Sequence, residues 1–242
     1  MATSSFLATA TTPSVGLVTW NSEGTEGGTF HSRKLHVPTD GSGLTLGRGY
    51  DMKEREPAGI LEDLSACDVL LADAKTLSKA AKLSGQAAKD FVVTNKLEKF
   101  EISKLGQRLL FDRTYAAILA DVKRICAKVD LVDKYGAFEW AKLDPAIAEI
   151  LVDLRFRGDY TPESRKFLQP LVVKNDLVGF AAAMKKAANW VGVPLDRFKR
   201  RHEFLAAAVA ARKTATKPPV NPKTGRGSTM PVPPPAWVSR TA

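Results

Sequence analysis

Acidic residues gather in a glycine-rich stretch near the N-terminus. Glu23 and Glu26 lie in the run NSEGTEGG, Asp40 begins the run DGSG, and Asp51 closes the run LTLGRGYD. Hydrolysis of a glycosidic bond commonly uses one carboxylic acid to protonate the leaving oxygen and a second carboxylate to activate water or to attack the sugar. The residue types therefore suit glycosidase chemistry, although a glycine-rich hairpin with solvated acids would show the same spacing.

The run that ends at Asp51 has a further property if its backbone is extended. Successive side chains of a strand point to opposite faces, so Thr45, Gly47, Gly49 and Asp51 would share one face. Two glycines between a hydroxyl and a carboxylate leave a shallow floor on which a sugar ring can approach the backbone closely.

These segments resemble the opening of the pesticin-like muramidases, which are related to the T-even phage lysozymes. The likeness rests on Ser22-Glu23-Gly24, Ser32-Arg33, His36-Val37-Pro38 and the run SGLTLGRGYDM at residues 42–52. It continues in the runs QRLLFDRTY, VDLRFRGDYTP and RFKRRHE, and so covers residues 17–210.

The resemblance implies a lysozyme-like fold and cleavage of the β-1,4 bond between N-acetylmuramic acid and N-acetylglucosamine, with inversion as in the phage-type enzymes. It assigns the general acid to Glu23, the residue that helps hold the attacking water to Thr45, and the aspartate that completes the site to Asp51. Phage lysozymes place their aspartate before the threonine, near Asp40 in this chain, so Asp40 is the alternative to Asp51. Glu26 is the alternative to Glu23. The expected substrate-binding residues are Arg33, His36, Arg48 and Tyr50.

A general acid also needs partly apolar surroundings, which Trp20 and Phe30 would supply. Near the other end of the chain, Arg197, Arg200 and Arg201 are expected either to bind wall carboxylates or to pair with acids such as Asp153 or Glu203.

The elements that must position these residues follow from hydrophobic periodicity. Residues 16–50 are rich in glycine with short apolar alternations, which predicts turns and hairpins. Apolar residues at helical spacing then predict helices over 61–77, 84–97, 105–129, 138–156, 176–191 and 194–211, with another helix starting at Thr161-Pro162. We therefore expect an α+β fold of lysozyme-like form, with a small β-containing N-terminal lobe, a larger all-helical lobe and the active-site cleft between them.

Three parts of the chain follow from composition. We expect residues 1–15 to be a loose lead-in, residues 16–211 to form one domain, for which the resemblance implies muramidase activity, and residues 212–242 to be a Pro- and Lys-rich tail without the pattern of a packed core. The chain has 36 Lys and Arg against 26 Asp and Glu, but the tail carries six of the net ten positive charges. The mildly basic body argues against a nucleic-acid-binding protein.

Several further expectations concern partners and surroundings. Cys67 and Cys126 are expected to be free, buried thiols, and His31 and His36 have no third ligand for a metal, so neither metal nor cofactor is expected. The N-terminus has no basic region of a secretory signal, and apolar runs stop short of the roughly 18 residues of a membrane span.

We expect a monomer, made in the cytoplasm, that acts on peptidoglycan in the periplasm or cell wall of a target or host bacterium. It would be an antibacterial effector, with an immunity protein and secretion machinery as partners, or a phage endolysin. The alternative is a non-catalytic peptidoglycan-binding module with a lysozyme-like fold.

Overall fold

The computed structural model of the chain describes residues 10–28 and 31–215. It is mostly helical, with one small antiparallel strand pair, as expected for an α+β chain with little sheet. The first elements are α2 (Leu17–Trp20), β1 (Thr45–Leu46), β2 (Tyr50–Asp51), α3 (Pro57–Ser65), α4 (Leu71–Ser78) and α5 (Gly85–Thr94). The later elements are α6 (Lys104–Cys126), α7 (Val129–Tyr135), η1 (Trp140–Lys142), α8 (Pro145–Arg157), α9 (Pro162–Val173), α10 (Leu177–Lys185), η2 (Ala187–Trp190) and α11 (Leu195–Ala215).

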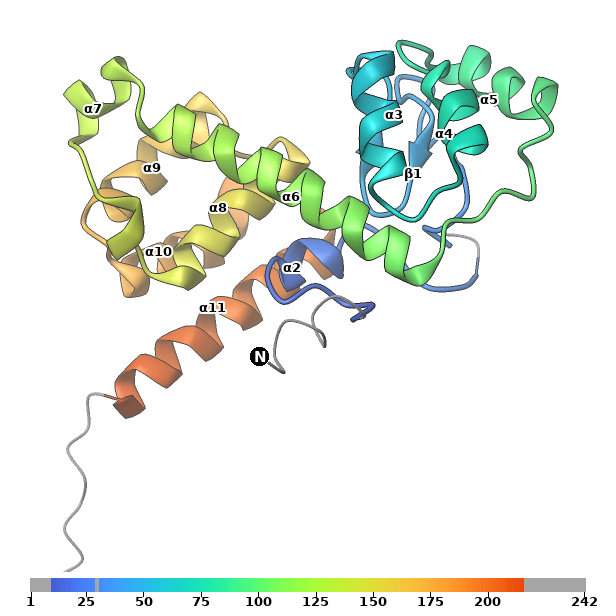
Figure 1. The fold of residues 1–242 in the computed structure, drawn as a ribbon. Coiled ribbons are helices and arrows are strands. Elements are labelled where there is room, and N and C mark those ends of the chain that lie inside the picture. The colour runs from blue at the N-terminus through green and yellow to red at the C-terminus, as the bar shows by residue number, and fades with distance from the viewer. Residues whose placement is uncertain (1–9, 29–30, 216–242) are drawn as a thin grey trace, which may run out of the picture.

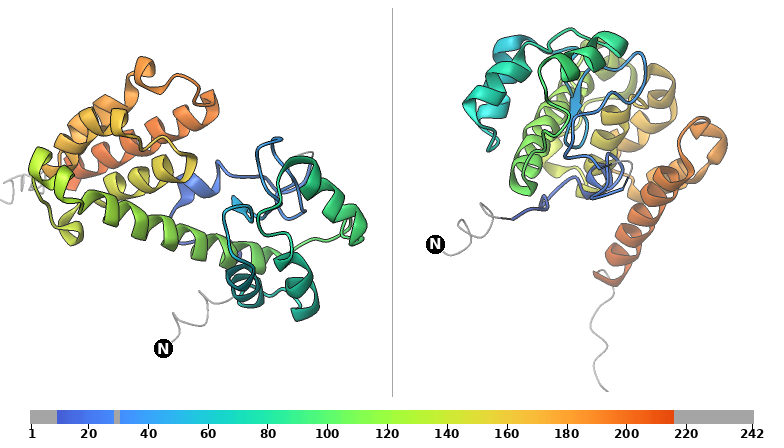
Figure 2. Two further views of the ribbon diagram at one scale, coloured as in Figure 1. Left: turned by 90° about the horizontal axis from the view of Figure 1, so that it is seen from above. Right: turned by 90° about the vertical axis from the view of Figure 1, so that its right-hand side faces the viewer.

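The long helix α6 runs through two lobes, each with its own hydrophobic core (Figure 1). Leu110 belongs to the core of the N-terminal lobe, whereas its neighbour Phe111 belongs to the core of the C-terminal lobe. Adjacent side chains of a helix point about 100° apart, so one helix can supply two cores at the point where it passes from one to the other. Seen from above, α6 runs along both lobes (Figure 2, left).

The N-terminal lobe contains the strand pair together with α3, α4 and α5. Its core includes Leu44, Leu46 and Tyr50 of the hairpin region and Ile60 and Leu77 of the helices. The lobe is therefore larger and more helical than the glycine-rich stretch from which we expected it to be built. The two helices expected over 61–77 and 84–97 in the larger lobe correspond to α3, α4 and α5, which instead share the core of the hairpin, because two short strands alone cannot bury a core.

The chain crosses between the lobes at its beginning. Residues 16–20, expected to be extended, form the short helix α2, and Val18 and Trp20 lie in the core of the C-terminal lobe. Glu149 of α8 accepts hydrogen bonds from the backbone N–H groups of Gly16 and Val18, which anchors the start of this helix. After α2 the chain enters the N-terminal lobe, and α6 brings it back.

The helix predictions are confirmed where capping signals reinforce the periodicity. Thr161 caps α9 in a reciprocal capping box with Ser164, and α6 lies within one to three residues of its predicted bounds. The helix predicted over 61–77 is instead two helices, separated where Asp68 adopts a φ of 61°. The segment 138–156 begins with a 3-10 turn, because Asp144 caps α8 and Pro145 starts it.

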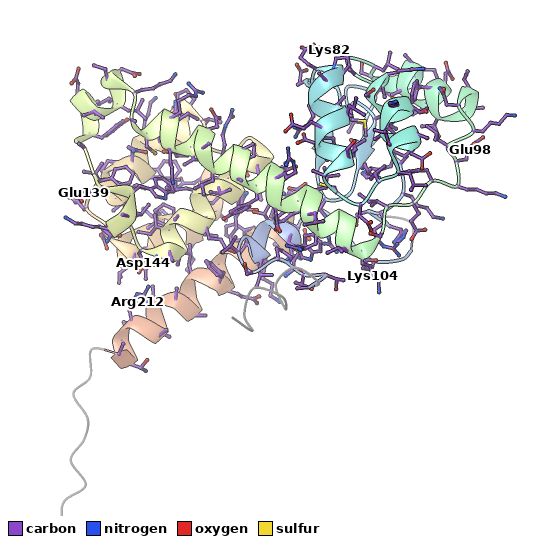
Figure 3. The ribbon with its side chains drawn as sticks, in the orientation of Figure 1. Lys82, Glu98, Lys104, Glu139, Asp144 and Arg212 are labelled. Atoms are coloured by element: carbon purple, nitrogen blue, oxygen red, sulfur yellow. The ribbon has the colours of Figure 1, made fainter. Side chains whose placement is uncertain are left out.

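The C-terminal helix α11 extends through Ala215, past the predicted end at residue 211. Its Arg212 forms an ion pair of 2.9 Å with Asp144, and the two labelled side chains lie near each other in Figure 3. Both cysteines are free and buried, as predicted. Within the described ranges, none of the helices is both long and apolar enough to cross a membrane.

Candidate active site

A cleft of about 900 Å³ lies where the loop after α2, the N-terminal lobe and the start of α11 meet. Its lining includes two of the three expected catalytic residues, Glu23 and Thr45, and also Gly49 from the turn between the strands. From the C-terminal lobe, α11 contributes Asp196 and Arg200. Clefts between lobes are common binding sites for small molecules and saccharides, so this is where we place the candidate active site.

Glu23 is positioned by the end of α2 and by the glycine that follows it. Its N–H donates to the carbonyl of Thr19 at 3.0 Å, which continues the helical turn. A Cβ on Gly24 would lie 2.5 Å from Cβ of Ser32, so the backbone can pass this point only without a side chain. The Glu23 side chain is 20% exposed, and its carboxyl is thus open to a ligand in the cleft.

Gly49 forms the floor beneath Glu23. Its φ is +83°, and a Cβ there would lie 2.5 Å from the Phe156 ring and 3.3 Å from Oε2 of Glu23. Glycine is required here because two groups of the protein itself approach this backbone closely. The two groups that approach Gly49 are the ring of Phe156, which belongs to α8 of the C-terminal lobe, and the carboxyl of the candidate acid Glu23.

We predict that Gly49→Ala disrupts the site. The new methyl group would push against the ring of Phe156, so the free energy of unfolding should fall by about 1–3 kcal/mol more than in Gly27→Ala. Gly27 is the matched control because its φ of +76° is similar but nothing lies within 4 Å of its Cβ position. Urea denaturation measures both variants, and equal losses would mean that only backbone strain matters.

Thr45 and Asp51 are directly opposite each other in the strand pair. They therefore share a face, as alternation predicted, although the run forms a hairpin and not one extended strand. The Thr45 hydroxyl donates to the carbonyl of Gly43 at 3.3 Å, while the N–H of Gly43 donates to Asp51 at 3.1 Å. The second oxygen of Asp51 accepts the N–H of Lys53 at 2.8 Å. Asp51 thus lies behind Thr45 and is absent from the cleft lining, and it contacts Thr45 through Gly43.

A chain of alternating charges leads from Glu23 into the C-terminal lobe. Arg197 of α11 pairs with Glu23 at 2.5 Å and with Asp153 of α8 at 2.6 Å. Arg201 pairs with the other oxygen of Asp153 at 2.5 Å and with Asp159 at 2.9 Å. Pairing of these arginines with Asp153, one of the two expected roles, is confirmed. The link to Glu23 was not foreseen, because it joins residues 174 positions apart.

The buried pairs shift the proton affinities of their members. Burial of the Asp153 carboxyl raises its pKa, but Arg201 and Arg197 outweigh this effect and hold the pKa below its usual value. Burial lowers the pKa of Arg197, yet Asp153 and Glu23 raise it above the ordinary arginine value overall. Both shifts favour the charged forms of Asp153 and Arg197, so Arg197 gives Glu23 a cationic partner at neutral pH.

Arg48 and Tyr50 require a correction, because we expected both to contact the substrate. Arg48 is 6% exposed and Tyr50 is 1% exposed. The Tyr50 hydroxyl donates to Asp63 at 2.8 Å, and burial raises the pKa of this phenol. Arg48 donates to backbone carbonyls and stacks over Trp20. Both side chains support the cleft from behind.

The other expected binding residues divide between the cleft and its supports. His36 lines the cleft, and its backbone pairs with Thr45 in both directions. Arg33 is absent from the lining and pairs with Glu26 at 2.9 Å and with Glu101. Asp40 is also absent from the lining, and its side chain is 96% exposed beside Lys89.

Neither aromatic residue expected to surround the acid is seen among the described residues that line the cleft. Trp20 is buried and meets Phe111 edge to face with ring centroids 5.1 Å apart, whereas Phe30 lies outside the described residues. A different feature reaches the cleft from α11, since Arg200 donates to the Ser22 hydroxyl at 2.7 Å. Across residues 10–28 and 31–215, no group of three or more His, Cys, Asp or Glu residues is arranged to hold a metal ion.

Comparison with known proteins places the whole cleft inside one domain family. Residues 16–202 match a family described as a domain of unknown function (DUF8812). The matched region begins directly before α2 and ends within α11, so it includes every residue that lines the cleft. No curated protein matches the chain.

Proposed function

The chain belongs to the DUF8812 family, whose activity is undefined, and we propose that it is a muramidase with a lysozyme-like fold that cleaves the glycan strand of peptidoglycan. The observation that carries this proposal is the placement of Glu23. Its carboxyl lies in an inter-lobe cleft, over Gly49 and beside the hairpin that holds Thr45. Glycoside hydrolysis commonly uses a carboxylic acid to protonate the leaving oxygen, and the Thr45 hydroxyl in the same cleft can hold the attacking water.

In the proposed reaction, Glu23 donates its proton to the glycosidic oxygen as the bond to the anomeric carbon breaks. Arg197 then stabilises the glutamate anion that remains, because its guanidinium lies 2.5 Å from Oε1. Asp153 holds Arg197 from the other side and fixes the direction of this interaction. The charge network therefore sets where the acid points, which is a requirement for proton transfer in the transition state.

Thr45 holds the attacking water in this proposal. Its hydroxyl donates to Gly43, which leaves the oxygen lone pairs available to accept a hydrogen bond from water. We assign the second carboxylate to Asp51, because it is the cross-strand partner of Thr45 and supports it through Gly43. That water would attack the face of the sugar opposite Glu23 and lose its proton to the Asp51 carboxylate, with inversion at the anomeric carbon.

Product analysis tests the proposal. Purified peptidoglycan is digested with the wild-type protein, the fragments are reduced with borohydride, and mass spectrometry identifies the reduced sugar. New reducing ends on N-acetylmuramic acid support a muramidase. New ends on N-acetylglucosamine would instead indicate cleavage of the other glycan bond, and free stem peptides would indicate an amidase.

The second carboxylate gives a separate prediction. Asp51→Asn should lose far more hydrolytic activity than Asp40→Asn, because an amide offers one acceptor oxygen to the two N–H groups that Asp51 now binds. Asp40 is exposed and contributes a surface ion pair of 3.3 Å with Lys89, which is worth little. Initial rates of peptidoglycan solubilisation measure both variants. The opposite order would favour the phage-type arrangement with Asp40.

A non-catalytic peptidoglycan-binding module is the second candidate. The observation that favours it is that both acids already have partners within the protein. Glu23 is paired with Arg197, and both oxygens of Asp51 bind backbone N–H groups. Sedimentation with insoluble peptidoglycan separates the two candidates. Binding by the wild type without new reducing ends would support the module and exclude the muramidase.

The biological setting follows from the substrate. A muramidase acts on the wall of another cell or of a lysing host, as an antibacterial effector or a phage endolysin. An effector would require an immunity protein in the cell that makes it, and co-purification with the product of a neighbouring gene would identify this partner.

A further inference from the structure

Arg48 is a buried cation, and apolar packing alone does not explain why a charged side chain occupies this position. Its side chain is 6% exposed, and the nearest carboxylate, that of Glu26, lies 4.0 Å away. Burial lowers the pKa of Arg48, and the charge of Glu26 opposes this only in part. A buried charge without a close counter-ion is costly, so a neutral side chain would be the cheaper filling for this space.

The contacts of the guanidinium point to its role. Nη1 donates to the carbonyl of Trp20 at 2.5 Å and also to the carbonyl of Gly24. These two carbonyls stand on either side of Glu23 in the chain. The planar group lies 4.0 Å above the Trp20 ring, which restrains it further. One side chain therefore binds the backbone that carries the candidate acid at two points.

Arg48 itself belongs to the other half of the site. It lies in the turn between β1 and β2, next to Gly49 and within the hairpin that carries Thr45. Trp20 belongs to the core of the C-terminal lobe, whereas Leu46 and Tyr50 on either side of the turn belong to the core of the N-terminal lobe. The guanidinium thus joins the two lobes underneath the cleft.

We propose that Arg48 is a positioning residue that sets the separation between Glu23 and the water held by Thr45. This inference rests on the proposed muramidase function. Proton donation and water attack must occur in one geometry. The acid directly follows α2, whose Trp20 packs in the core of the C-terminal lobe, whereas Thr45 belongs to the hairpin of the N-terminal lobe. Short hydrogen bonds from a charged guanidinium fix the distance between Glu23 and Thr45 more tightly than the chain segments that connect the two lobes can.

The kinetic test replaces Arg48 by methionine, which keeps an apolar side chain on Trp20 and removes the donors. On soluble peptidoglycan strands, Arg48→Met should lower kcat on the order of 100-fold and leave KM unchanged, because a small displacement of a catalytic group costs rate and not binding. Arg48→Lys keeps the charge and a donor and should restore part of kcat. Unchanged kcat in a folded Arg48→Met variant would overturn the proposal.

Arg165 supplies the matched control. Its guanidinium lies 5.3 Å from the Tyr160 ring and donates to the Tyr160 carbonyl at 3.1 Å, so it makes the same two kinds of contact away from the cleft. Arg165→Met should lower the melting temperature and keep the wild-type kcat. An equal fall of kcat in both variants would show that the effect of Arg48 is general destabilisation.

A measurement without substrate separates this inference from the proposed function. Backbone NMR of the folded Arg48→Met and Arg48→Lys variants should show shifted amide signals at Glu23, Gly24 and Thr45, while those of α9 stay in place. These shifts with an inactive wild type would refute the muramidase and keep the bridge between lobes. Unshifted signals would refute the bridge, whatever the activity. If Arg48→Met does not fold, Arg48→Lys decides the outcome by the same readouts.

Discussion

Glu23→Gln is expected to lower the rate of peptidoglycan hydrolysis by about 10²- to 10⁴-fold, the usual contribution of a general acid. Glutamine has the same shape, and its amide oxygen can still accept the hydrogen bond that Arg197 now donates to Oε1. The amide has no acidic proton to give to the leaving oxygen. The variant should therefore remain folded and bind the glycan, and only the release of new reducing ends should fall.

Glu26→Gln is the control for this experiment. Glu26 lies three residues further on and accepts hydrogen bonds from Arg33 at 2.9 Å and from Gln107 at 2.7 Å, and it is absent from the cleft lining. Its replacement should leave the rate of hydrolysis near that of the wild type. Loss of activity in Glu26→Gln with full activity in Glu23→Gln would transfer the role of the acid to Glu26. Full activity in both variants would exclude either glutamate as the general acid.

Asp153→Ala is expected to lower the free energy of unfolding by about 3–5 kcal/mol, because it leaves buried arginines without their counter-charge. Asp153 is 0% exposed, and its two oxygens pair with Arg197 and Arg201. Urea denaturation followed by circular dichroism measures the loss. Glu163→Ala is the control, since Glu163 forms an exposed ion pair of 2.6 Å with Lys166 and should contribute about 0–1 kcal/mol.

The lowered pKa of Asp153 makes the free energy of unfolding depend on pH. Its pKa is lower in the folded chain than in the unfolded chain, so its stabilising effect is present above the ordinary aspartate pKa of about 3.9. As the pH falls through the folded pKa, the unfolded state takes up more protons and the effect is lost. The wild type should lose stability below about pH 4, and Asp153→Ala should show a shallower loss. If the free energy of unfolding fell equally with pH in both proteins, carboxylates other than Asp153 would cause the loss.

Local sequence signals were sufficient for much of the helical framework. The Thr161-Pro162 start of α9 and the long apolar stripe of α6 are determined by hydrogen bonding and burial within one element, and both predictions are confirmed. The break between α3 and α4 was missed. Its position depends on how the two short helices pack against each other, which hydrophobic spacing along the chain does not describe.

The candidate site was predicted only in part. Glu23 and Thr45 do line one cleft, and the family resemblance had singled them out among the acids and hydroxyls of this stretch. Arg48 and Tyr50 lie in the same run but are buried, because the tight turn of the hairpin directs them into the protein. A sequence motif shows which residues lie close together in the chain. Which of their side chains can reach a ligand depends on which face of the hairpin the rest of the protein covers.

The acids, the hydroxyl and the glycines between residues 23 and 51 are properties of the sequence, and so are the helices that follow them. The tertiary structure alone decided that Asp153 and Arg197 act on Glu23, and that Arg48 links the backbone around Glu23 to the hairpin. These contacts join residues far apart in the chain, and their strength comes from burial between two lobes. Periodicity and spacing report local geometry, so they do not predict contacts between residues that meet only in the folded protein.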